Sequence, residues 1–95
     1  MFKDLDPILH SQLRLAIISI LIKDEAEFNE LKEQTNASSG NLSVQIQKLK
    51  DAGYIDILKK FRNNYPLTIC RITPQGKKAF NVYVINLREY IGKTA

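Results

Sequence analysis

Apolar residues divide the first half of the chain into three helical stretches. Over residues 13–22 they cover nearly the whole circumference of a helix, which predicts a central helix buried on more than one side. A short helix is predicted over residues 29–35, capped by Asn29, and a longer one over residues 38–52, capped by Ser38. This pattern predicts a buried helix followed by two helices that are joined by a short turn.

The spacing of apolar residues changes after Gly53, which suits the cap of the third helix because glycine tolerates a positive φ. Residues 54–58 and 67–72 predict the two strands of a hairpin, and the polar segment 59–66 predicts its tip. Pro66 lacks a backbone N–H, so the start of the return strand is not expected at the centre of a sheet. The acidic segment 23–27 is predicted to be a solvated connection.

A capping residue followed by proline marks the start of two further segments. Asp6-Pro7 predicts a short turn before the first long helix. Thr73-Pro74 begins a last helix, which runs to about Ile91 and carries apolar residues three or four positions apart.

Charge is distributed unevenly along the chain, whose formal net charge is +4. Residues 1–37 carry four Lys/Arg and seven Asp/Glu, whereas residues 38–95 carry ten and three. This asymmetry predicts a basic face on the second part of the chain, which favours a polyanionic partner. The length predicts a single domain over residues 1–95, mainly α with a small β-hairpin, and a partner subunit would help so small a domain to bury surface.

The residue types that carry most enzyme chemistry are sparse. The lone His10 has no identifiable acid–base partner, Cys70 lies in an apolar strand pattern, and no Gly-rich phosphate loop is present. Without a second cysteine or a Cys/His cluster, neither a disulfide nor a metal site is predicted, and no cofactor is expected. The longest apolar stretch, residues 13–22, is too short for a membrane span. We therefore expect a cytoplasmic, nucleoid-associated protein that is not an enzyme and has no membrane partner.

Several short motifs resemble those of the MarR-like winged helix-turn-helix regulators of the small, single-domain type. The resemblance covers nearly the whole chain, and the motifs follow one another in the same order: Leu5-Asp6-Pro7-Ile8-Leu9-His10, Arg14-Leu15-Ala16-Ile17, Gly40-Asn41-Leu42-Ser43, Lys48-Leu49, Ala52-Gly53-Tyr54-Ile55 and Thr73-Pro74-Gln75-Gly76-Lys77. Each motif is weak alone, but their joint order and spacing are specific. The resemblance implies a DNA-binding transcriptional regulator, usually dimeric, whose helix 38–52 enters the major groove beside a wing of two or three strands.

The helix predicted over residues 38–52 has an outer face that is polar but lightly charged, opposite the apolar Leu42, Ile46 and Leu49. Asn and Gln side chains pair with adenine edges, and an apolar side chain such as Val44 can meet a thymine methyl group. Gly40 lets the backbone approach a phosphate at the helix N-terminus. The candidate DNA-contacting residues on this helix are Ser38, Ser39, Gly40, Asn41, Ser43, Val44, Gln47 and Lys48. An ordinary amphipathic helix with a solvated face is the alternative interpretation.

The hairpin tip is basic and adds a second set of candidate DNA contacts, because long cations there can reach phosphates or the minor groove. These candidates are Lys60, Arg62, Asn63 and Asn64. Hairpin tips are also often basic for solubility alone. Helix and wing together predict a regulator that binds double-stranded DNA sequence-specifically. A winged helix that serves as a protein-interaction module of a transcription-associated complex is the alternative.

The last helix carries an apolar stripe that is longer than so small a domain can cover by itself. A twofold dimer covers it with the same patch on both subunits and presents two recognition helices to half-sites about one helical turn apart. The predicted interface residues are Leu5, Ile8, Leu9, Phe80, Tyr83, Val84, Leu87, Tyr90 and Ile91. Packing within one chain is the alternative for Phe80 and Tyr83. The sequence identifies neither an operator nor an effector ligand.

Overall fold

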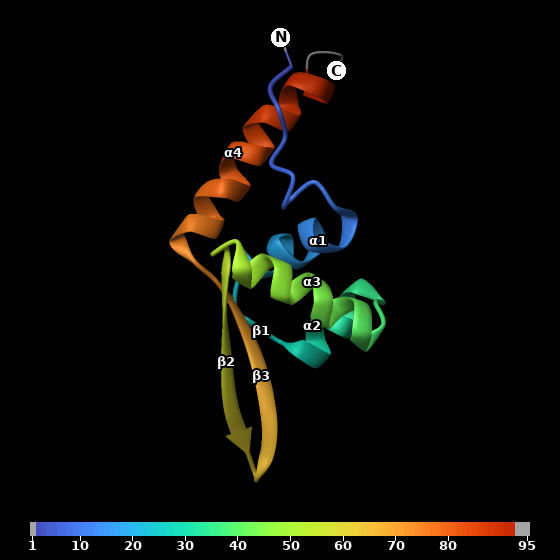
Figure 1. The fold of residues 1–95 in the computed structure, drawn as a ribbon, viewed down its shortest axis with the longest axis vertical. Coiled ribbons are helices and arrows are strands. Elements are labelled where there is room, and N and C mark those ends of the chain that lie inside the picture. The colour runs from blue at the N-terminus through green and yellow to red at the C-terminus, as the bar shows by residue number, and fades with distance from the viewer. Residues whose placement is uncertain (1, 93–95) are drawn as a thin grey trace.

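The computed structural model describes residues 2–92. The protein consists of helices and a projecting β-hairpin. The elements are α1 (Gln12–Leu21), β1 (Ala26–Glu27), α2 (Phe28–Thr35), α3 (Ser39–Asp51), β2 (Ile55–Arg62), β3 (Tyr65–Ile72) and α4 (Pro74–Ile91). Figure 1 shows α1, α2 and α3 gathered at the base of the hairpin, with the hairpin at one end of the molecule and α4 at the other. The predicted mainly α fold with a small β wing is confirmed, although residues 1 and 93–95 of the predicted domain lie outside the described residues.

Capping side chains begin two of the helices where the sequence predicts. The Ser38 hydroxyl accepts a hydrogen bond from the Asn41 backbone N–H at 3.2 Å, and the Thr73 hydroxyl accepts one from the Gly76 N–H at 3.0 Å. Ahead of α1, Asp6 Oδ1 accepts a hydrogen bond from the Ile8 N–H at 2.8 Å, which holds the predicted short turn.

Helix α2 begins one residue earlier than the predicted cap at Asn29. Its N-cap is Glu27, which exchanges side-chain and backbone hydrogen bonds with Glu30 in a capping box. Asn36 ends the helix in the left-handed conformation, with φ 57°. The acidic pair therefore outcompetes the amide of Asn29 for the free N–H groups of the first turn.

Strand β1 corrects the prediction that segment 23–27 is only a solvated connection. The sheet order is β1-β3-β2, and β1 pairs antiparallel with β3, with Ala26 opposite Cys70. Ala26 is only 5% exposed, because its small apolar side chain packs into the core. Two residues are too few for a periodic signal, which explains why the pattern of the sequence does not reveal this strand.

The hairpin strands are longer than predicted, because most of the segment 59–66 belongs to them. Strands β2 and β3 pair antiparallel from Ile55 opposite Ile72 to Arg62 opposite Tyr65. The turn is only Asn63-Asn64, with φ 50° and 69°, and asparagine tolerates the left-handed conformation that a tight two-residue hairpin needs. The wing is therefore a regular ribbon almost to its tip.

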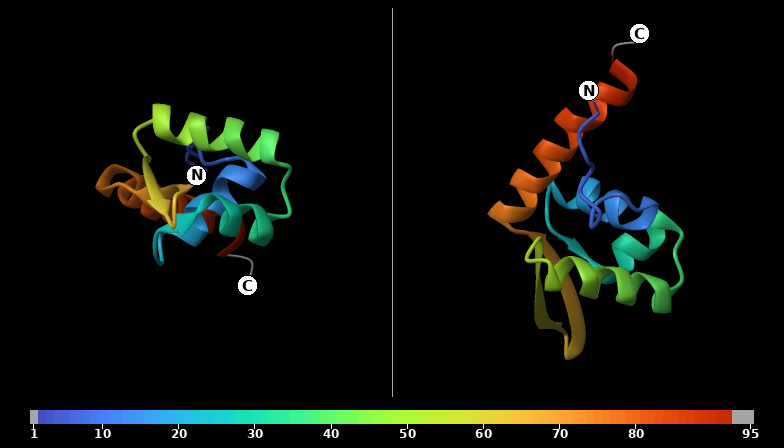
Figure 2. Two further views of the ribbon diagram at one scale, coloured as in Figure 1. Left: turned by 90° about the horizontal axis from the view of Figure 1, so that it is seen from below. Right: turned by 45° about the horizontal axis from the view of Figure 1, so that its top comes forward.

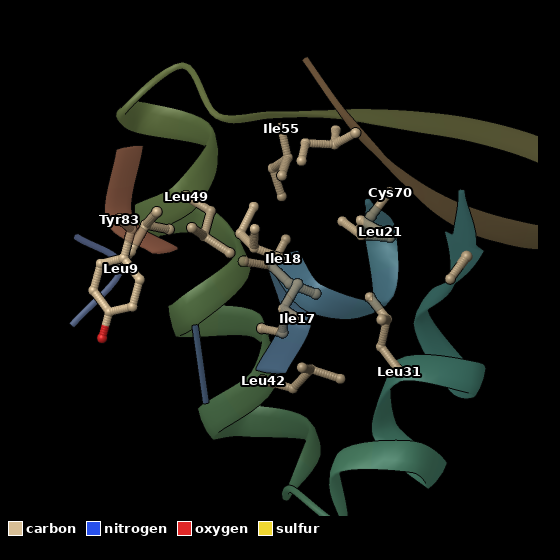
Figure 3. Packing of buried hydrophobic residues seen from close by; sticks show 13 residues of the cluster. Leu9, Ile17, Ile18, Leu21, Leu31, Leu42, Leu49, Ile55, Cys70 and Tyr83 are labelled. Atoms are coloured by element: carbon tan, nitrogen blue, oxygen red, sulfur yellow. The ribbon is translucent and has the colours of Figure 1, made fainter. Parts of the chain in front are cut away.

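One apolar core joins the helices to the base of the sheet. Figure 3 shows Ile17 and Ile18 of α1 between α3 and α2, with Ile55 of β2 closing one side. Leu42, Ile46 and Leu49 form the inner face of α3, as predicted. The buried core residues are Leu9, Ile17, Ile18, Leu21, Ala26, Leu31, Leu42, Ile46, Leu49, Ile55, Ile69, Cys70, Ile72 and Tyr83.

The N-terminal segment runs beside α4, as both Figure 1 and Figure 2 show. The rings of Phe2 and Tyr90 lie 4.9 Å apart between centroids, and the Tyr90 hydroxyl donates a hydrogen bond to the Lys3 carbonyl oxygen at 2.6 Å. Nearer the core, the Tyr83 hydroxyl lies 3.1 Å from Nδ1 of His10. These contacts join the N-terminal segment to α4 on the side of the molecule away from the wing.

Candidate nucleic-acid interface

The outer face of α3 is open to solvent over its whole length. The eight candidate residues on this helix and its cap, from Ser38 to Lys48, are all exposed. Val44 is 51% exposed, although its side chain is apolar. A helix whose exposed face offers hydroxyl, amide and methyl groups can contact the edges of bases, which present hydrogen-bonding groups and thymine methyls in the major groove.

A groove of about 470 Å³ separates α3 from the wing. It is lined by Phe28, Ser43, Ile46, Gln47, Lys50, Ile57, Lys59 and Thr68. Lys50 in the last turn of α3 and Lys59 on β2 bring two cations to its walls, and Lys59 Nζ donates a hydrogen bond to Thr68 Oγ1 at 3.1 Å. The groove therefore combines a polar helix face with positive charge.

Lys50 and Lys59 are absent from the DNA contacts that the sequence predicts. Lys50 follows Ser43 by seven residues, so helical spacing places both on the side of α3 that faces the wing. Lys59 shares the face of β2 that carries Ile57, because side chains alternate along a strand. The sequence pattern does not reveal Lys59, because the polar segment 59–66 predicts only the tip of a hairpin, whereas Lys59 pairs with Thr68 inside the ribbon.

Lys60 and Arg62, by contrast, lie on the face of the hairpin turned away from α3, since alternation separates them from Lys59. Arg62 Nη2 lies 2.7 Å from Glu27 Oε1, so this predicted phosphate contact already has an ionic partner. Lys60 is exposed. Asn63 and Asn64 occupy the tip itself and are exposed.

Hydrogen bonds orient the side-chain amides of the α3 surface. Gln47 Nε2 donates to Asp51 Oδ1 at 2.9 Å. Gln45 Nε2 donates to Asn41 Oδ1 at 3.1 Å. Gln45 is half-buried, and its role is not predictable from the sequence because its second partner, Arg14, comes from α1.

The predicted dimer residues have different surroundings in the single chain. Leu9 is 0% exposed and Tyr83 is 4% exposed, so both side chains are already buried in the core of a single chain. For Tyr83, packing within one chain is the alternative that the sequence leaves open. Tyr90 and Ile91 are exposed, and the remaining predicted residues are half-buried: Leu5, Ile8, Phe80, Val84 and Leu87. Helix α4 also exposes Val82 and Ile85, at 47% and 60%, which the sequence prediction missed.

The remaining reactive groups offer little chemistry. Burial raises the pKa of the Cys70 thiol to about 11, with Lys59 acting weakly in the other direction, so the thiol stays protonated at neutral pH. Within residues 2–92, no group of three or more His, Cys, Asp or Glu side chains could hold a metal ion. Over the same residues, every helix is too short or too polar to cross a membrane.

Three helices beside a three-stranded sheet, with the β2–β3 hairpin projecting as a wing, define a winged helix-turn-helix. The chain belongs to the winged helix DNA-binding domain family, whose model matches residues 13–91.

The relatives of the chain include archaeal and bacterial proteins. It is 35% identical over 81 residues to the uncharacterized protein MJ0432 of Methanocaldococcus jannaschii, covering 84% of this chain and 88% of that protein. Its fold is similar to a transcriptional regulator homologue from Pyrococcus horikoshii OT3, with a TM-score of 0.85, 25% identity and coverage of 92% and 87% of the two chains. It is also similar to PadR of Bacillus subtilis, solved in complex with operator DNA, with a TM-score of 0.71, 19% identity and coverage of 79% and 49%. The last likeness concerns the fold alone.

Proposed function

We propose that the protein is a transcriptional regulator that binds double-stranded DNA sequence-specifically as a homodimer. Helix α3 enters the major groove, and the wing lies on the flanking backbone or minor groove. The observation that carries this proposal is the exposed, polar and lightly charged face of α3, bordered by a groove with Lys50 and Lys59 on its walls. A cytoplasmic, nucleoid-associated location follows from this function.

The relatives support the proposal at the level of the class. The Pyrococcus horikoshii protein is described as a transcriptional regulator homologue, and the PadR structure contains operator DNA. Within this class, we propose the MarR-like branch on the strength of the sequence motifs, while the PadR likeness rests on fold.

The contacts divide into those that position the duplex and those that read it. Lys48, Lys50 and Lys59 are long cations at the margins of the α3 face, so we assign them to phosphates, whereas Lys60 and Arg62 reach the backbone only from the outer face of the wing. The base-reading set occupies the early and middle part of the helix: Asn41, Ser43, Val44 and Gln47. Ser38, Ser39 and Gly40 bring the helix N-terminus to a phosphate.

The dimer rests on α4 and the N-terminal segment. Val82, Ile85 and Ile91 leave apolar surface exposed on one helix. A hollow of about 640 Å³ beside it is lined by Asp4, Leu5, Pro7, His10, Leu87 and Tyr90. A second copy of the chain, packed through the same surface, would cover both features in each subunit.

Selection of binding sites from random duplexes, followed by titration of the selected site, tests the proposed function. We expect Asn41→Ala and Gln47→Ala to weaken binding to the selected duplex by about 1–3 kcal/mol per lost base contact, while binding to unrelated duplexes is kept. Gln75→Ala, at an exposed position of α4, is the control and leaves both unchanged. If the wild-type protein binds no duplex in a salt-dependent way, the proposal is rejected in favour of the alternative function, a protein-interaction module of a transcription-associated complex.

A further inference from the structure

Two side-chain amides of α3 have defined polarities, because Gln45 is bonded to a group that can only donate and Gln47 to a group that can only accept. An amide offers a carbonyl oxygen on one side and an NH2 group on the other, and its hydrogen-bond partners decide which side faces where. Arginine has donors only, and an ionised aspartate has acceptors only. Arg14 and Asp51 therefore fix the orientation of the amides bonded to them.

Arg14 on α1 anchors the first amide. Its Nη1 donates to Gln45 Oε1 at 2.5 Å, and its Nε donates to the Ile8 carbonyl oxygen at 2.6 Å. The guanidinium is half-buried and held from two sides, so Gln45 must turn its oxygen toward it. The Gln45 NH2 group then faces Asn41 and donates to its Oδ1 at 3.1 Å. This leaves the Asn41 NH2 group free to point outward as a donor.

Asp51 anchors the second amide in the opposite sense. Gln47 Nε2 donates to Asp51 Oδ1 at 2.9 Å, across one helical turn. The carboxylate accepts hydrogen bonds and cannot donate them, so the Gln47 NH2 group must face it. The Gln47 carbonyl oxygen is therefore the group left free for an external partner.

We propose that the protein reads its operator with amides of opposite polarity, Asn41 as a donor and Gln47 as an acceptor. This inference rests on the proposed DNA-binding function. Asn41 then selects a base that presents an acceptor oxygen in the major groove, guanine O6 or thymine O4, and Gln47 selects the amino group of adenine or cytosine. Arg14, Gln45 and Asp51 are positioning residues, which act on the bases only through the amides that they orient.

Amides that are oriented before DNA binds can discriminate between bases, because a mismatched base places two donors or two acceptors opposite each other. A base whose amino group meets the Asn41 NH2 group leaves two donors facing each other, and flipping the Asn41 amide would break its bond with Gln45. A free amide could turn at little cost and accept either kind of base. The Arg14–Gln45–Asn41 chain therefore restricts which bases are tolerated.

Gln45→Glu tests the chain by reversing its polarity. The carboxylate at position 45 still accepts from Arg14, but its other oxygen now faces Asn41 and draws the Asn41 NH2 group inward. We expect the preference at one base pair of each half-site to change from a base with an acceptor oxygen, guanine or thymine, to a base with an amino group, by about fivefold or more in relative affinity. Gln12→Glu is the matched control, because Gln12 lines the same hollow as Gln45 and Asn41 but is not hydrogen-bonded to Asn41 in the described part of the chain. It adds the same charge and leaves the base preference unchanged.

Asp51→Asn tests the second amide, because asparagine can accept or donate and so releases the orientation of Gln47. We expect discrimination at a different base pair to fall severalfold, without reversal. Asp56→Asn on β2 removes the same charge and keeps the preference. Site selection with all four variants is the readout, and the proposal is overturned if the wild-type protein selects a sequence but Gln45→Glu and Asp51→Asn select the same one. Absence of any duplex binding by the wild-type protein would instead reject the proposed function.

Discussion

At the scale of single residues, Tyr54 joins the base of the wing to the N-terminal segment. Its hydroxyl donates to Asp6 Oδ2 at 2.5 Å, while Asp6 Oδ1 accepts from the Ile8 N–H. The pKa of Tyr54 is raised from 10.0 to about 12, mainly by burial and then by the hydrogen bond and charge of Asp6. The neutral phenol is therefore favoured in the folded state.

We predict that Tyr54→Phe lowers the free energy of unfolding at pH 7 by about 1 kcal/mol, the usual net value of one hydrogen bond. The pH dependence has a definite sign. Because folding raises the pKa, the contribution of the phenol is complete below pH 10 and is lost as the pH rises toward 12. Urea unfolding at several pH values should show the difference between wild type and variant shrinking over this window. Tyr65→Phe, at an exposed tyrosine, is the control, and an equal loss there would contradict the assignment.

At the scale of elements, Gly76 sets how closely α4 approaches the start of the wing. A Cβ at this position would overlap the Tyr54 carbonyl oxygen and lie 2.9 Å from Ile72 Cγ1. That carbonyl oxygen also accepts a hydrogen bond from the Thr73 N–H at 3.0 Å, so it cannot move away freely. By contrast, a Cβ at Gly40 in the first turn of α3 would meet nothing within 4 Å.

These two glycines give a matched pair of substitutions. We predict that Gly76→Ala destabilises the fold by about 1–3 kcal/mol through overpacking, whereas Gly40→Ala stabilises it by about 0.5–1 kcal/mol through helix propensity. Gly40→Ala should nevertheless weaken DNA binding, because the new methyl group occupies the space in which a phosphate would approach the helix. Thermal unfolding of both variants measures the change in stability, and duplex titration measures the change in DNA affinity. A Gly40→Ala protein that binds the duplex as tightly as wild type would count against the phosphate contact.

The positions of the helices can largely be predicted from the sequence, whereas the shortest strand cannot. Capping side chains at Ser38 and Thr73, together with helical periodicity, locate α3 and α4 to within a residue or two. The sequence pattern does not reveal the strand Ala26–Glu27, because such a short strand is determined by its partner β3 and not by its own pattern.

In the candidate site, the exposed face of α3 can be predicted from helical periodicity. The position of that face beside the wing cannot be predicted in this way. Which cations line the groove depends on the length and register of β2, so the sequence pattern alone does not separate Lys59 from Lys60. The orientations of the Gln45 and Asn41 amides depend on Arg14, which is distant in sequence and reaches Gln45 only in the folded chain.

At the scale of the whole molecule, α4 and the wing extend from opposite ends of the core, and the chain measures 53 Å along its longest axis and 20 Å along its shortest (Figure 1). An elongated chain of this kind leaves much of α4 outside the core of a single copy. The exposed Val82 and Ile85 lie on that helix. Dimerisation through α4 would bury them and leave the α3 faces free.

We predict that Ile85→Asp shifts the protein from dimer to monomer at micromolar concentration in sedimentation velocity. A buried charge without a partner is costly at an interface, whereas Ile85 is exposed in one chain, so the folded monomer should tolerate it. Gln34→Asp places the same charge at an exposed position of α2, away from the proposed interface on α4, and should leave the dimer intact. A wild-type protein that sediments as a monomer would refute the arrangement.

The affinity for duplex DNA as a function of salt concentration tests DNA binding by α3 and the wing most directly. We predict that the logarithm of the association constant falls linearly with the logarithm of salt concentration, and that the double variant Lys50→Ala, Lys59→Ala reduces the slope by about two for each subunit. Lys3→Ala is the control, because the N-terminal segment lies at the end of the molecule opposite the wing tip (Figure 1), and it should leave the slope unchanged. Binding that is absent, that ignores salt, or that loses the same slope in Lys3→Ala as in the double variant would contradict this assignment.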